Sequence, residues 1–303
     1  MNFNKIVVIG SCNTDMVVNA NRLPKPGETV IGNSFKIFHG GKGANQAVAV
    51  ARSGGKVSFV TKIGDDFYGR QSLENLKNEG VNIDNIITDL VLPTGIALIV
   101  VDSNGENSIA VASGANAALK PVHIDEIKGI IENAEYLLMQ LEIPVTTVIY
   151  AAKIATEKGV RVILNPAPAT SVPEELLKYT YAIIPNIVEV EELTNVKIVD
   201  WDSAKQAADI ISSKGVHLVV ITLGETGAFL KDGGNYFKVP GYKVDAVDTT
   251  AAGDTFCGTF CVGLSEGMSP VEAVKMANKA ASIAVSRQGA QSSIPYKNEI
   301  TNY

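Results

Sequence analysis

The stretch of the sequence best suited to chemistry is VDTTAAGDTF, residues 247–256. Small residues there precede a helical pattern that runs from Asp254 to Gly267, and residues 248–267 contain no Lys or Arg. Backbone N–H groups of Ala251, Ala252 and Gly253 would point at one spot and form an anion hole for developing phosphoryl charge. Asp254 would then act as a general base on a substrate hydroxyl. The alternative is that Asp254 only caps the helix or balances its dipole.

A second candidate is the glycine-rich stretch HGGKGANQ, residues 39–46. Three glycines in four positions let backbone N–H groups approach a ligand closely, and the apolar run that follows predicts a helix whose N-terminus favours anions or hydroxyls. The stretch is neither a Walker A loop nor a dinucleotide fingerprint, because Lys42 is not followed by Ser or Thr and the glycine spacing is wrong. An ordinary tight loop is the alternative.

Two further stretches follow predicted strands. In Pro185-Asn186-Ile187-Val188-Glu189, the side chains of Asn186 and Glu189 would share one helix face and could orient a hydrated Mg²⁺ with nucleotide phosphates. The alternative is a helix-capping arrangement between these two residues. Residues 222–227 (TLGETG) form a turn between two β-rich runs and could be a loop on the nucleotide side. The three histidines are scattered and show no metal-ligand spacing.

These motifs need elements that position them, and the pattern predicts alternating strands and helices. Strands are expected at residues 5–10, 57–63, 136–141, 160–164, 181–185 and 218–223, because short apolar runs without alternation fit a sheet that is covered on both faces. Helices are expected at 65–79, 144–158 and 203–214, each ending at or next to a glycine. This alternation predicts an α/β fold with a mainly parallel central sheet flanked by helices.

Two segments interrupt this alternation. Residues 15–38 and 94–112 contain β-rich pieces, the second with a turn at residues 103–106. Together they predict a small β-sheet lid, inserted as residues 13–38 and 94–113 into a single domain of residues 1–303. Two edge hairpins without motion are the alternative.

Composition narrows the class of protein. The chain of 303 residues has a net charge of -6, which argues against a nucleic-acid backbone as partner. Uncharged stretches such as Leu90–Val101 are too short to span a membrane, and the apolar run before Gly10 is too short for a signal peptide. Three cysteines form an odd, sparse set that suits a reducing cytoplasm.

Taken in order, the motifs resemble those of the PfkB family of carbohydrate kinases along nearly the whole chain. The resemblance rests on the stretches GSCNTD, PGET, GGKGANQA, MQLE, NPAPA, PN, ITLG, residues 247–256 and RQGAQ, which begin at residues 10, 26, 40, 139, 165, 185, 221, 247 and 287. It implies a parallel-sheet α/β body with a β-sheet lid, and a homodimer in which the lids pair. The implied activity is transfer of a phosphoryl group from ATP to the 5-hydroxyl of D-ribose, which gives D-ribose 5-phosphate and ADP.

The resemblance also implies residue roles. Sugar contacts are expected from the following residues: Asn13, Thr14, Asp15, Gly41, Lys42, Gly43, Ala44, Asn45 and Glu142. Asp254 would be the base beside an anion hole of Ala251, Ala252 and Gly253. The ATP side would be lined by these residues: Asn186, Thr222, Leu223, Gly224, Glu225, Thr226, Gly227, Gly253, Asp254 and Asn278. Glu189 would help to place Mg²⁺ through water. A K⁺ ion would lie at Asp248, Thr250, Ala284, Arg287, Gly289 and Ser293, several acting through backbone carbonyls.

Other functions stay open at this point. A deoxyribose kinase or another sugar or nucleoside kinase of the family is the nearest alternative, although Asn13 would favour ribose if it binds the 2-hydroxyl. A nucleoside kinase would need an aromatic base pocket, and the lid segments hold only Phe35 and Phe38 as aromatic residues. A non-catalytic sugar-binding regulator is the alternative from a different class. An intact Asp254 and the absence of a basic nucleic-acid helix argue against it.

Overall fold

An eight-stranded sheet forms the centre of the computed structural model, which describes residues 5–302. Across the sheet the strands follow the order β4 (Val57–Val60), β1 (Ile6–Ile9), β9 (Tyr136–Met139), β10 (Arg161–Leu164), β11 (Ala182–Ile183), β12 (Leu218–Thr222), β13 (Gly227–Asp232) and β14 (Asn235–Pro240). The first six are parallel, and β13 and β14 extend the sheet as an antiparallel hairpin. The predicted α/β fold with a mainly parallel sheet is confirmed.

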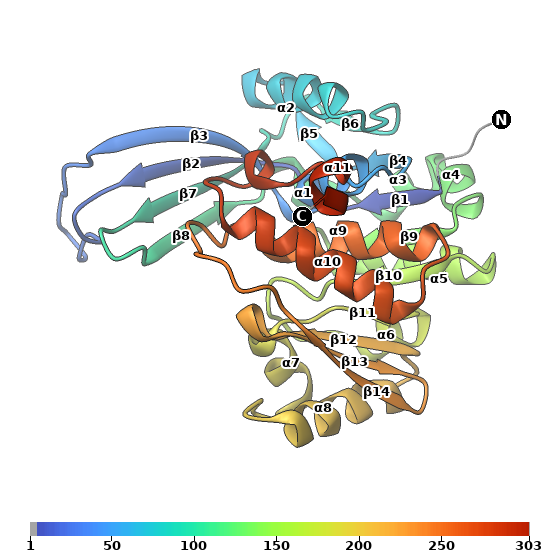
Figure 1. Cartoon of the computed structure of the whole chain (residues 1–303). Helices are drawn as coiled ribbons and strands as arrows, with labels where there is room; N and C mark the ends of the chain where they lie inside the picture. Colours follow the sequence, from blue (N-terminus) through green and yellow to red (C-terminus); the bar gives the residue numbers. More distant parts are fainter. Residues whose placement is uncertain (1–4, 303) are drawn as a thin grey trace.

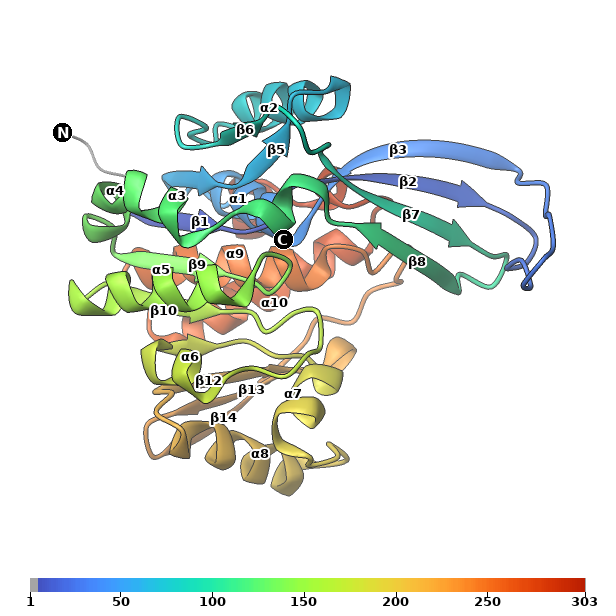
Figure 2. The ribbon, with the colours of Figure 1, turned by 180° about the vertical axis from the view of Figure 1, so that it is seen from behind.

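Helices cover both faces of this sheet (Figures 1 and 2). Along β1 the side chains alternate between two cores, with Ile6 and Val8 in one and Val7 and Ile9 in the other. The first core is closed by α1 (Lys42–Arg52), α9 (Ala252–Ser265) and α10 (Pro270–Val285). The second is closed by α3 (Pro121–Glu126), α4 (Lys128–Glu132), α5 (Val145–Glu157), α6 (Glu174–Tyr179), α7 (Ile187–Thr194) and α8 (Trp201–Ser213). Burial on both faces explains the continuous apolar runs of the strands.

The predicted strand at 57–63 is in fact two strands. It breaks after Val60, and β5 (Lys62–Gly64) leaves the central sheet to pair with β6 (Ile87–Asp89), beside α2 (Phe67–Asn78). An ion pair of 2.8 Å between Lys62 Nζ and Asp89 Oδ2 joins the two strands. The break falls at Thr61 and Lys62, two polar residues inside the segment that was predicted as one strand.

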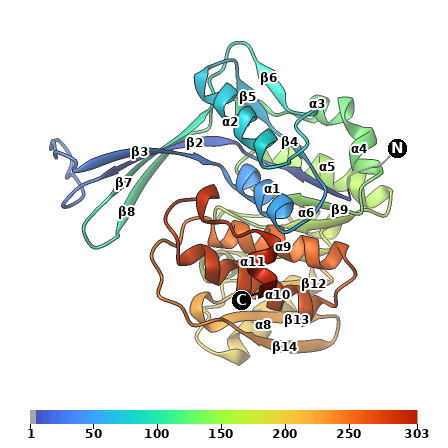
Figure 3. The same cartoon turned by 45° about the horizontal axis from the view of Figure 1, so that its top comes forward.

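The two segments that interrupt the alternation form one separate four-stranded sheet, which we call the outer sheet. Its strands follow the order β3 (Ser34–Gly40), β2 (Asn13–Asn19), β7 (Gly95–Val101) and β8 (Asn107–Ala112). Because β2 pairs in parallel with β7, the two segments are one sheet and not two independent hairpins. The outer sheet projects from the body, most clearly in the tilted view of Figure 3.

Short elements complete the chain: η1 (Gly114–Ala118), η2 (Gly224–Thr226), η3 (Gln291–Ser293) and α11 (Lys297–Asn302). The predicted helices lie within two residues of the observed ones, and capping residues account for their starts. Asp200 accepts a hydrogen bond from the Ser203 amide at the start of α8, and Ser269 precedes Pro270 at the start of α10. Among residues 5–302, no helix has the length and apolar character that crossing a membrane requires.

Candidate active site

The predicted site residues gather at one edge of the central sheet, where its parallel strands end. Asn13 follows β1, Glu142 follows β9, Asn186 follows β11, and Thr222 ends β12. The carboxyl ends of parallel strands are the usual place for ligand sites in α/β proteins. The sheet order therefore puts the predicted sugar residues beside β1 and β9, and the predicted nucleotide residues beside β11 and β12.

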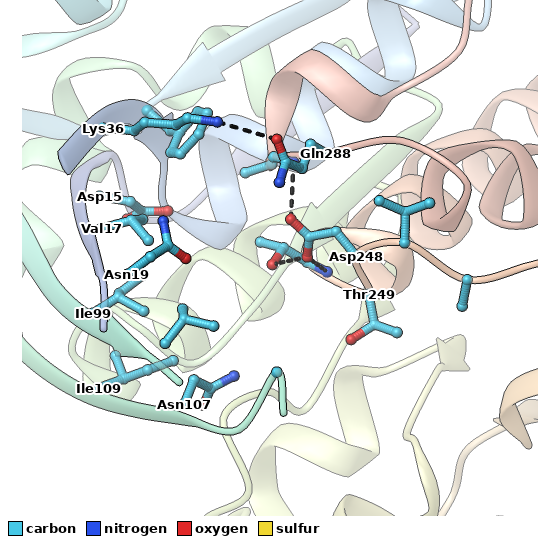
Figure 4. Close-up of a pocket in the computed structure, with 18 residues that line it drawn as sticks. Asp15, Val17, Asn19, Lys36, Ile99, Asn107, Ile109, Asp248, Thr249 and Gln288 are labelled. Atoms are coloured by element: carbon cyan, nitrogen blue, oxygen red, sulfur yellow. Dashed lines mark hydrogen bonds between the residues drawn. The ribbon is translucent and has the colours of Figure 1, made fainter. Parts of the chain in front are cut away.

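A cavity of about 360 Å³ lies between the outer sheet and two loops of the body (Figure 4). Asp15, Val17 and Asn19 line it from alternate positions of β2, and Asp248 and Gln288 line it from the loops. Lys36 Nζ donates to Gln288 Oε1 at 3.1 Å and ties the outer sheet to the second loop. The lining of the cavity thus combines polar side chains such as Asp15 and Asp248 with apolar ones such as Val17, as small-molecule sites do.

Of the predicted sugar residues, Asp15 lines this cavity, whereas Asn13, Asn45 and Asp254 are only 4%, 5% and 7% exposed. Thr14 differs from its neighbours, because successive side chains of a strand point to opposite faces. Its side chain lies on the face of β2 opposite to Asp15, and β2 is paired on both sides. The geometry therefore gives no support to the expected sugar contact of Thr14.

The amide of Asn13 has a fixed orientation. Asn116, in η1, donates from Nδ2 to Asn13 Oδ1 at 2.8 Å and to the Cys12 carbonyl at 3.1 Å, and its Oδ1 accepts from the Cys12 amide at 2.9 Å. Asn116 is 1% exposed. Because Asn13 Oδ1 accepts from Asn116, the NH₂ group of Asn13 points away from Asn116, where it could donate to a ligand.

Glu142 holds the start of α1. Its Oε2 accepts from the backbone N–H of Lys42 at 3.1 Å and from the hydroxyl of Ser11. The N-cap residue itself, Gly41, offers no side chain, so a carboxylate one hundred residues away supplies the negative charge that a helix N-terminus favours. This contact is structural, and the expected sugar contact of Glu142 stays a prediction.

Asp254 lies in the first turn of α9 and receives two hydrogen bonds from α1. Asn45 Nδ2 donates to its Oδ2 at 2.9 Å, and Gln46 Nε2 donates to its Oδ1 at 2.9 Å. Both donors are side-chain amides, so they favour the ionised carboxylate as their acceptor. A helix-capping role alone does not explain Asp254, because its side chain accepts hydrogen bonds from another helix.

Burial and crowded charge perturb the ionisable groups of this site. Burial raises the pKa of Asp254, against the lowering effects of Lys42, Asn45 and Gln46. Burial, followed by the charges of Glu142 and Asp254, raises the pKa of Asp15 to about 7. Burial alone would lower the pKa of Lys42, but the surrounding carboxylates outweigh it and the pKa is raised. Lys42 therefore stays a cation among carboxylates, a pattern found at functional sites.

The predicted anion hole is only partly formed by free amides. Ala251 has a left-handed backbone (φ 59°) and acts as N-cap of α9, and the Gly253 amide lies in the first turn, where no intrahelical acceptor exists. The Ala252 amide, however, donates to the Thr249 carbonyl at 3.3 Å. In this conformation the turn before α9 uses the Ala252 donor, and the anion hole of Ala251, Ala252 and Gly253 stays a prediction.

On the nucleotide side, Asn186 and Glu189 form a capping box. Asn186 Oδ1 accepts from the Glu189 amide and Glu189 Oε2 accepts from the Asn186 amide, both at 2.9 Å. The capping interpretation is thus confirmed, and the Mg²⁺ role of Glu189 stays a prediction. Burial raises the pKa of Glu189, partly offset by the Asn186 N–H and Lys42.

The remaining nucleotide-side residues lie close to this box. A parallel bridge pairs Asn186 with Thr222, so the loop 222–227 adjoins the start of α7. Asn278, on α10, donates from Nδ2 to the carbonyls of Val239 at 3.3 Å and Pro240 at 3.1 Å. Its amide nitrogen therefore fixes the end of β14, and contact with a nucleotide is not needed to explain it.

The predicted cation residues lie on two adjoining loops. Asp248 Oδ1 accepts from the amide and hydroxyl of Thr250, and its Oδ2 accepts from the Gly289 amide at 2.9 Å. These bonds lower the pKa of Asp248 despite its burial. The Arg287 side chain pairs with Glu299, so this residue can offer only its carbonyl. Within residues 5–302, no cluster of three or more His, Cys, Asp or Glu side chains could hold a metal ion.

Several residues of the site were not predicted. Asn116 orients Asn13, while Gln46, Gln140 and Asn165 form a buried network around Asp254. Gln46, Gln140 and Asn165 stand in motifs that carried the family resemblance, yet no ligand role was assigned to them. For Gln140 and Asn165 the sequence did hold a signal. Each is an amide directly after a buried apolar strand, where a polar group needs a hydrogen-bond partner.

Known proteins match this arrangement over nearly the whole chain. A model described as pfkB family carbohydrate kinase matches residues 4–297. A ribokinase of Haemophilus influenzae is 44% identical over 98% of this chain and 97% of that protein. A bifunctional ribokinase/ribose-5-phosphate isomerase A of Fructilactobacillus sanfranciscensis is 44% identical over 98% of this chain, which spans only 56% of that longer protein.

The same holds for solved structures. An Arabidopsis thaliana ribokinase complexed with ribose and ATP superposes with a TM-score of 0.94 and 35% identity, covering 99% of this chain and 98% of that chain. The similarity in sequence thus covers 98% of this chain, and the similarity in fold covers 99% of it. The chain therefore belongs to the pfkB family of carbohydrate kinases.

Proposed function

We propose that the chain is a ribokinase, which transfers the γ-phosphoryl group of ATP to the 5-hydroxyl of D-ribose. The observation that carries this proposal is the buried Asp254 carboxylate, which two amides of α1 hold at the N-terminus of α9. It lies between the sugar-side residues of β1 and the nucleotide-side loops of β11 and β12. Full-length similarity to proteins named ribokinase supports the choice of ribose.

The residues suggest how the reaction would proceed. Asp15 offers acceptors and Asn13 offers donors, so together they can bind neighbouring sugar hydroxyls. Asp254 would take the proton of the 5-hydroxyl as its oxygen attacks the γ-phosphorus, and the amides at the start of α9 would stabilise the charge on the transferring group. Mg²⁺, when bound with the nucleotide, would neutralise phosphate charge. The buried Glu189 carboxylate suits an outer contact through water, since Mg²⁺ keeps most of its own water.

A coupled assay of ADP release across ribose, 2-deoxyribose, fructose and adenosine tests this function. Ribose should give the highest kcat/KM. Because Asn116 orients the Asn13 amide, the NH₂ group of Asn13 would donate to the 2-hydroxyl; loss of that hydroxyl would leave a buried donor unpaired, which costs about 1–3 kcal/mol. A preference for ribose over 2-deoxyribose of roughly tenfold or more is therefore expected. Faster turnover of fructose, adenosine or 2-deoxyribose than of ribose would refute the assignment.

We also propose a monovalent cation site at the two loops that carry Asp248 and Gly289. Its donors would be carboxylate and carbonyl oxygens, which suit a hard cation such as K⁺. The Gly289–Asp248 hydrogen bond joins these loops, and the first of them leads directly into α9. Replacing K⁺ by tetramethylammonium should therefore lower kcat, because the loop before α9 loses its bridging charge. Identical kcat in both salts at equal ionic strength would exclude the site.

For the assembly, we propose a homodimer through the outer sheet. Phe35, Ile37 and Leu98 lie on the face opposite to the cavity and are 57%, 49% and 56% exposed. A contiguous apolar face of this kind is a usual mark of an interface. Light scattering should give twice the monomer mass of 32.0 kDa. Leu98→Asp should give a monomer, whereas Val199→Asp, at an exposed apolar residue elsewhere, should stay dimeric. A monomeric wild type would contradict the proposal.

A further inference from the structure

Behind Asp254 lies a chain of buried amides that touches no predicted ligand. Gln46, on α1, donates both hydrogens of its Nε2, one to Asp254 Oδ1 at 2.9 Å and one to Asn165 Oδ1 at 3.0 Å. Its Oε1 accepts from Gln140 Nε2 at 2.5 Å. Gln46 and Gln140 are 0% exposed and Asn165 is 7% exposed. Both donors of Gln46 and one lone pair of its oxygen are thus used inside the protein.

The backbone fixes the direction of this chain. Asn165 Nδ2 donates to the Ile184 carbonyl at 2.9 Å, and a backbone carbonyl can only accept. The oxygen of Asn165 must therefore face Gln46, and Gln46 must donate to it from its NH₂ group. The second hydrogen of that same NH₂ group then faces Asp254. The amides of Asn165 and Gln46 therefore each have one orientation that satisfies their neighbours. In that orientation Gln46 donates to the carboxylate of Asp254.

On its far side Gln46 meets Gln140, whose own Oε1 has no hydrogen-bond partner in the described structure. Gln140 stands directly after β9 and presents its Nε2 to the oxygen of Gln46. Gly10, after β1, leaves the space for this side chain, because a Cβ there would lie 2.1 Å from Gln140 Oε1. Flipping Gln46 would therefore set NH₂ against NH₂ at Gln140 and oxygen against oxygen at Asp254 and Asn165. The Gln46 amide therefore has one favourable orientation.

We propose that Gln46 is a positioning residue for the base, oriented by Asn165 and Gln140, and that it holds the Asp254 carboxylate ionised and aimed at the sugar hydroxyl. The proposal rests on the proposed role of Asp254. Hydrogen bonds that are made only to the charged form stabilise that form. In a site from which water is largely excluded, a fixed donor is worth more than a mobile one, since it needs no reorganisation during the reaction.

Other titratable groups face Asp254, and their effects on it must be separated from the effect of Gln46. Lys42 faces it from α1, Glu142 from the segment after β9, and Cys257 from its own helix. The carboxylates of Asp15, on β2, and Glu189, on α7, also act on it. A substitution at Gln46 alters none of these groups. Its effect on the pH profile therefore reports on the hydrogen bond itself.

The test compares Gln46→Met with a matched control, Thr259→Val. Methionine keeps the length of glutamine and removes both donors. Thr259 Oγ1 bonds to Ser53 Oγ at 2.9 Å, so Thr259→Val removes a different buried hydrogen bond between the end of α1 and α9, away from Asp254. Asn165→Leu serves as a second variant if Gln46→Met does not fold, because it releases the orientation of Gln46 without removing its donor.

For Gln46→Met we expect the acidic limb of the kcat/KM profile to move up by about one to two pH units, the size of one hydrogen bond to a charged group. At pH 7 kcat should fall about tenfold to a hundredfold, while KM for ATP stays near its wild-type value. Asn165→Leu should move the same limb in the same direction by less. Thr259→Val should lower the melting temperature and leave the limb unchanged.

Two results would overturn the proposal. One is a Gln46→Met variant that is folded and keeps the wild-type pH profile with kcat within twofold. The other is an equal shift of the acidic limb of the kcat/KM profile in Thr259→Val. The shift would then result from loosened packing between α1 and α9 and not from the lost Gln46 hydrogen bond. Both are distinguishable from failure of the proposed base, because in that case Asp254→Asn itself would retain activity.

Discussion

Asp254→Asn is expected to lower kcat by roughly 10²–10⁴, the usual contribution of a positioned general base. Asparagine keeps the size of the side chain, and its oxygen can still accept from Gln46 Nε2. Its NH₂ group can donate to Asn45 Oδ1, a buried atom without a hydrogen-bond partner in the described structure, once the Asn45 amide turns over. The amide cannot, however, accept the proton of a hydroxyl. KM for ribose should change less than kcat. Asp202→Asn, at an exposed residue in the first turn of α8, is the control and should keep wild-type activity.

The same variant should be more stable than the wild type at neutral pH. Burial raises the pKa of Asp254 in the folded protein, so ionising it costs folding free energy once pH exceeds the unfolded value of about 3.9. An uncharged amide avoids this cost, and the gain in melting temperature should shrink as pH falls towards 4. An inactive variant with a higher melting temperature at pH 7.5 separates loss of the base from loss of the fold. Near-normal turnover would remove Asp254 from its role.

Gly41→Ala should have the second-largest effect, on both stability and sugar binding. Gly41 has φ +87° and precedes α1, and a Cβ there would lie 2.7 Å from the Asn13 nitrogen and 2.9 Å from Cys12 Cα. The neighbouring atoms are backbone and cannot rotate away. Strain and overpacking of this kind cost about 1–3 kcal/mol each. We therefore expect a loss of roughly 2–6 kcal/mol of unfolding free energy and a raised KM for ribose.

Gly129→Ala is the matched control for that substitution. Gly129 lies in α4, where a Cβ would meet no atom within 4 Å, so alanine should be neutral or stabilise the protein by up to about 1 kcal/mol. Urea unfolding and ribose titration of both variants provide the comparison. If Gly41→Ala unfolds at the wild-type urea concentration, the close approach of α1 to the segment after β1 is not as tight as the structure shows.

The sequence was sufficient for the class of fold and for the order of its elements. Glycine, proline and capping signals mark where elements begin and end, and apolar runs such as Ile6–Ile9 indicate strands that are buried on both faces. Motifs at strand ends then fall at one edge of the sheet because parallel strands share their direction. Asn13, Glu142 and Asn186, which the family resemblance proposed as ligand contacts, each follow a parallel strand at this edge.

Hydrogen bonds between residues far apart in the sequence could not be predicted from local patterns. The bond from Gln46 to Asp254 joins residues 208 positions apart, and that from Lys42 to Glu142 joins residues 100 apart. Local spacing also could not decide that Ala252 uses its amide in the turn before α9, or that Glu189 caps α7. Each of these outcomes depends on which partner the tertiary fold brings within reach.

The central claim is that ATP phosphorylates the 5-hydroxyl of ribose, and identification of the product tests it most directly. The protein, ribose, MgATP and K⁺ can be incubated together and the product examined by phosphorus and carbon NMR. We expect ADP and D-ribose 5-phosphate in equal amounts, with phosphorus coupled to carbon 5. A phosphate at another carbon, or hydrolysis of ATP without a sugar phosphate, would contradict it.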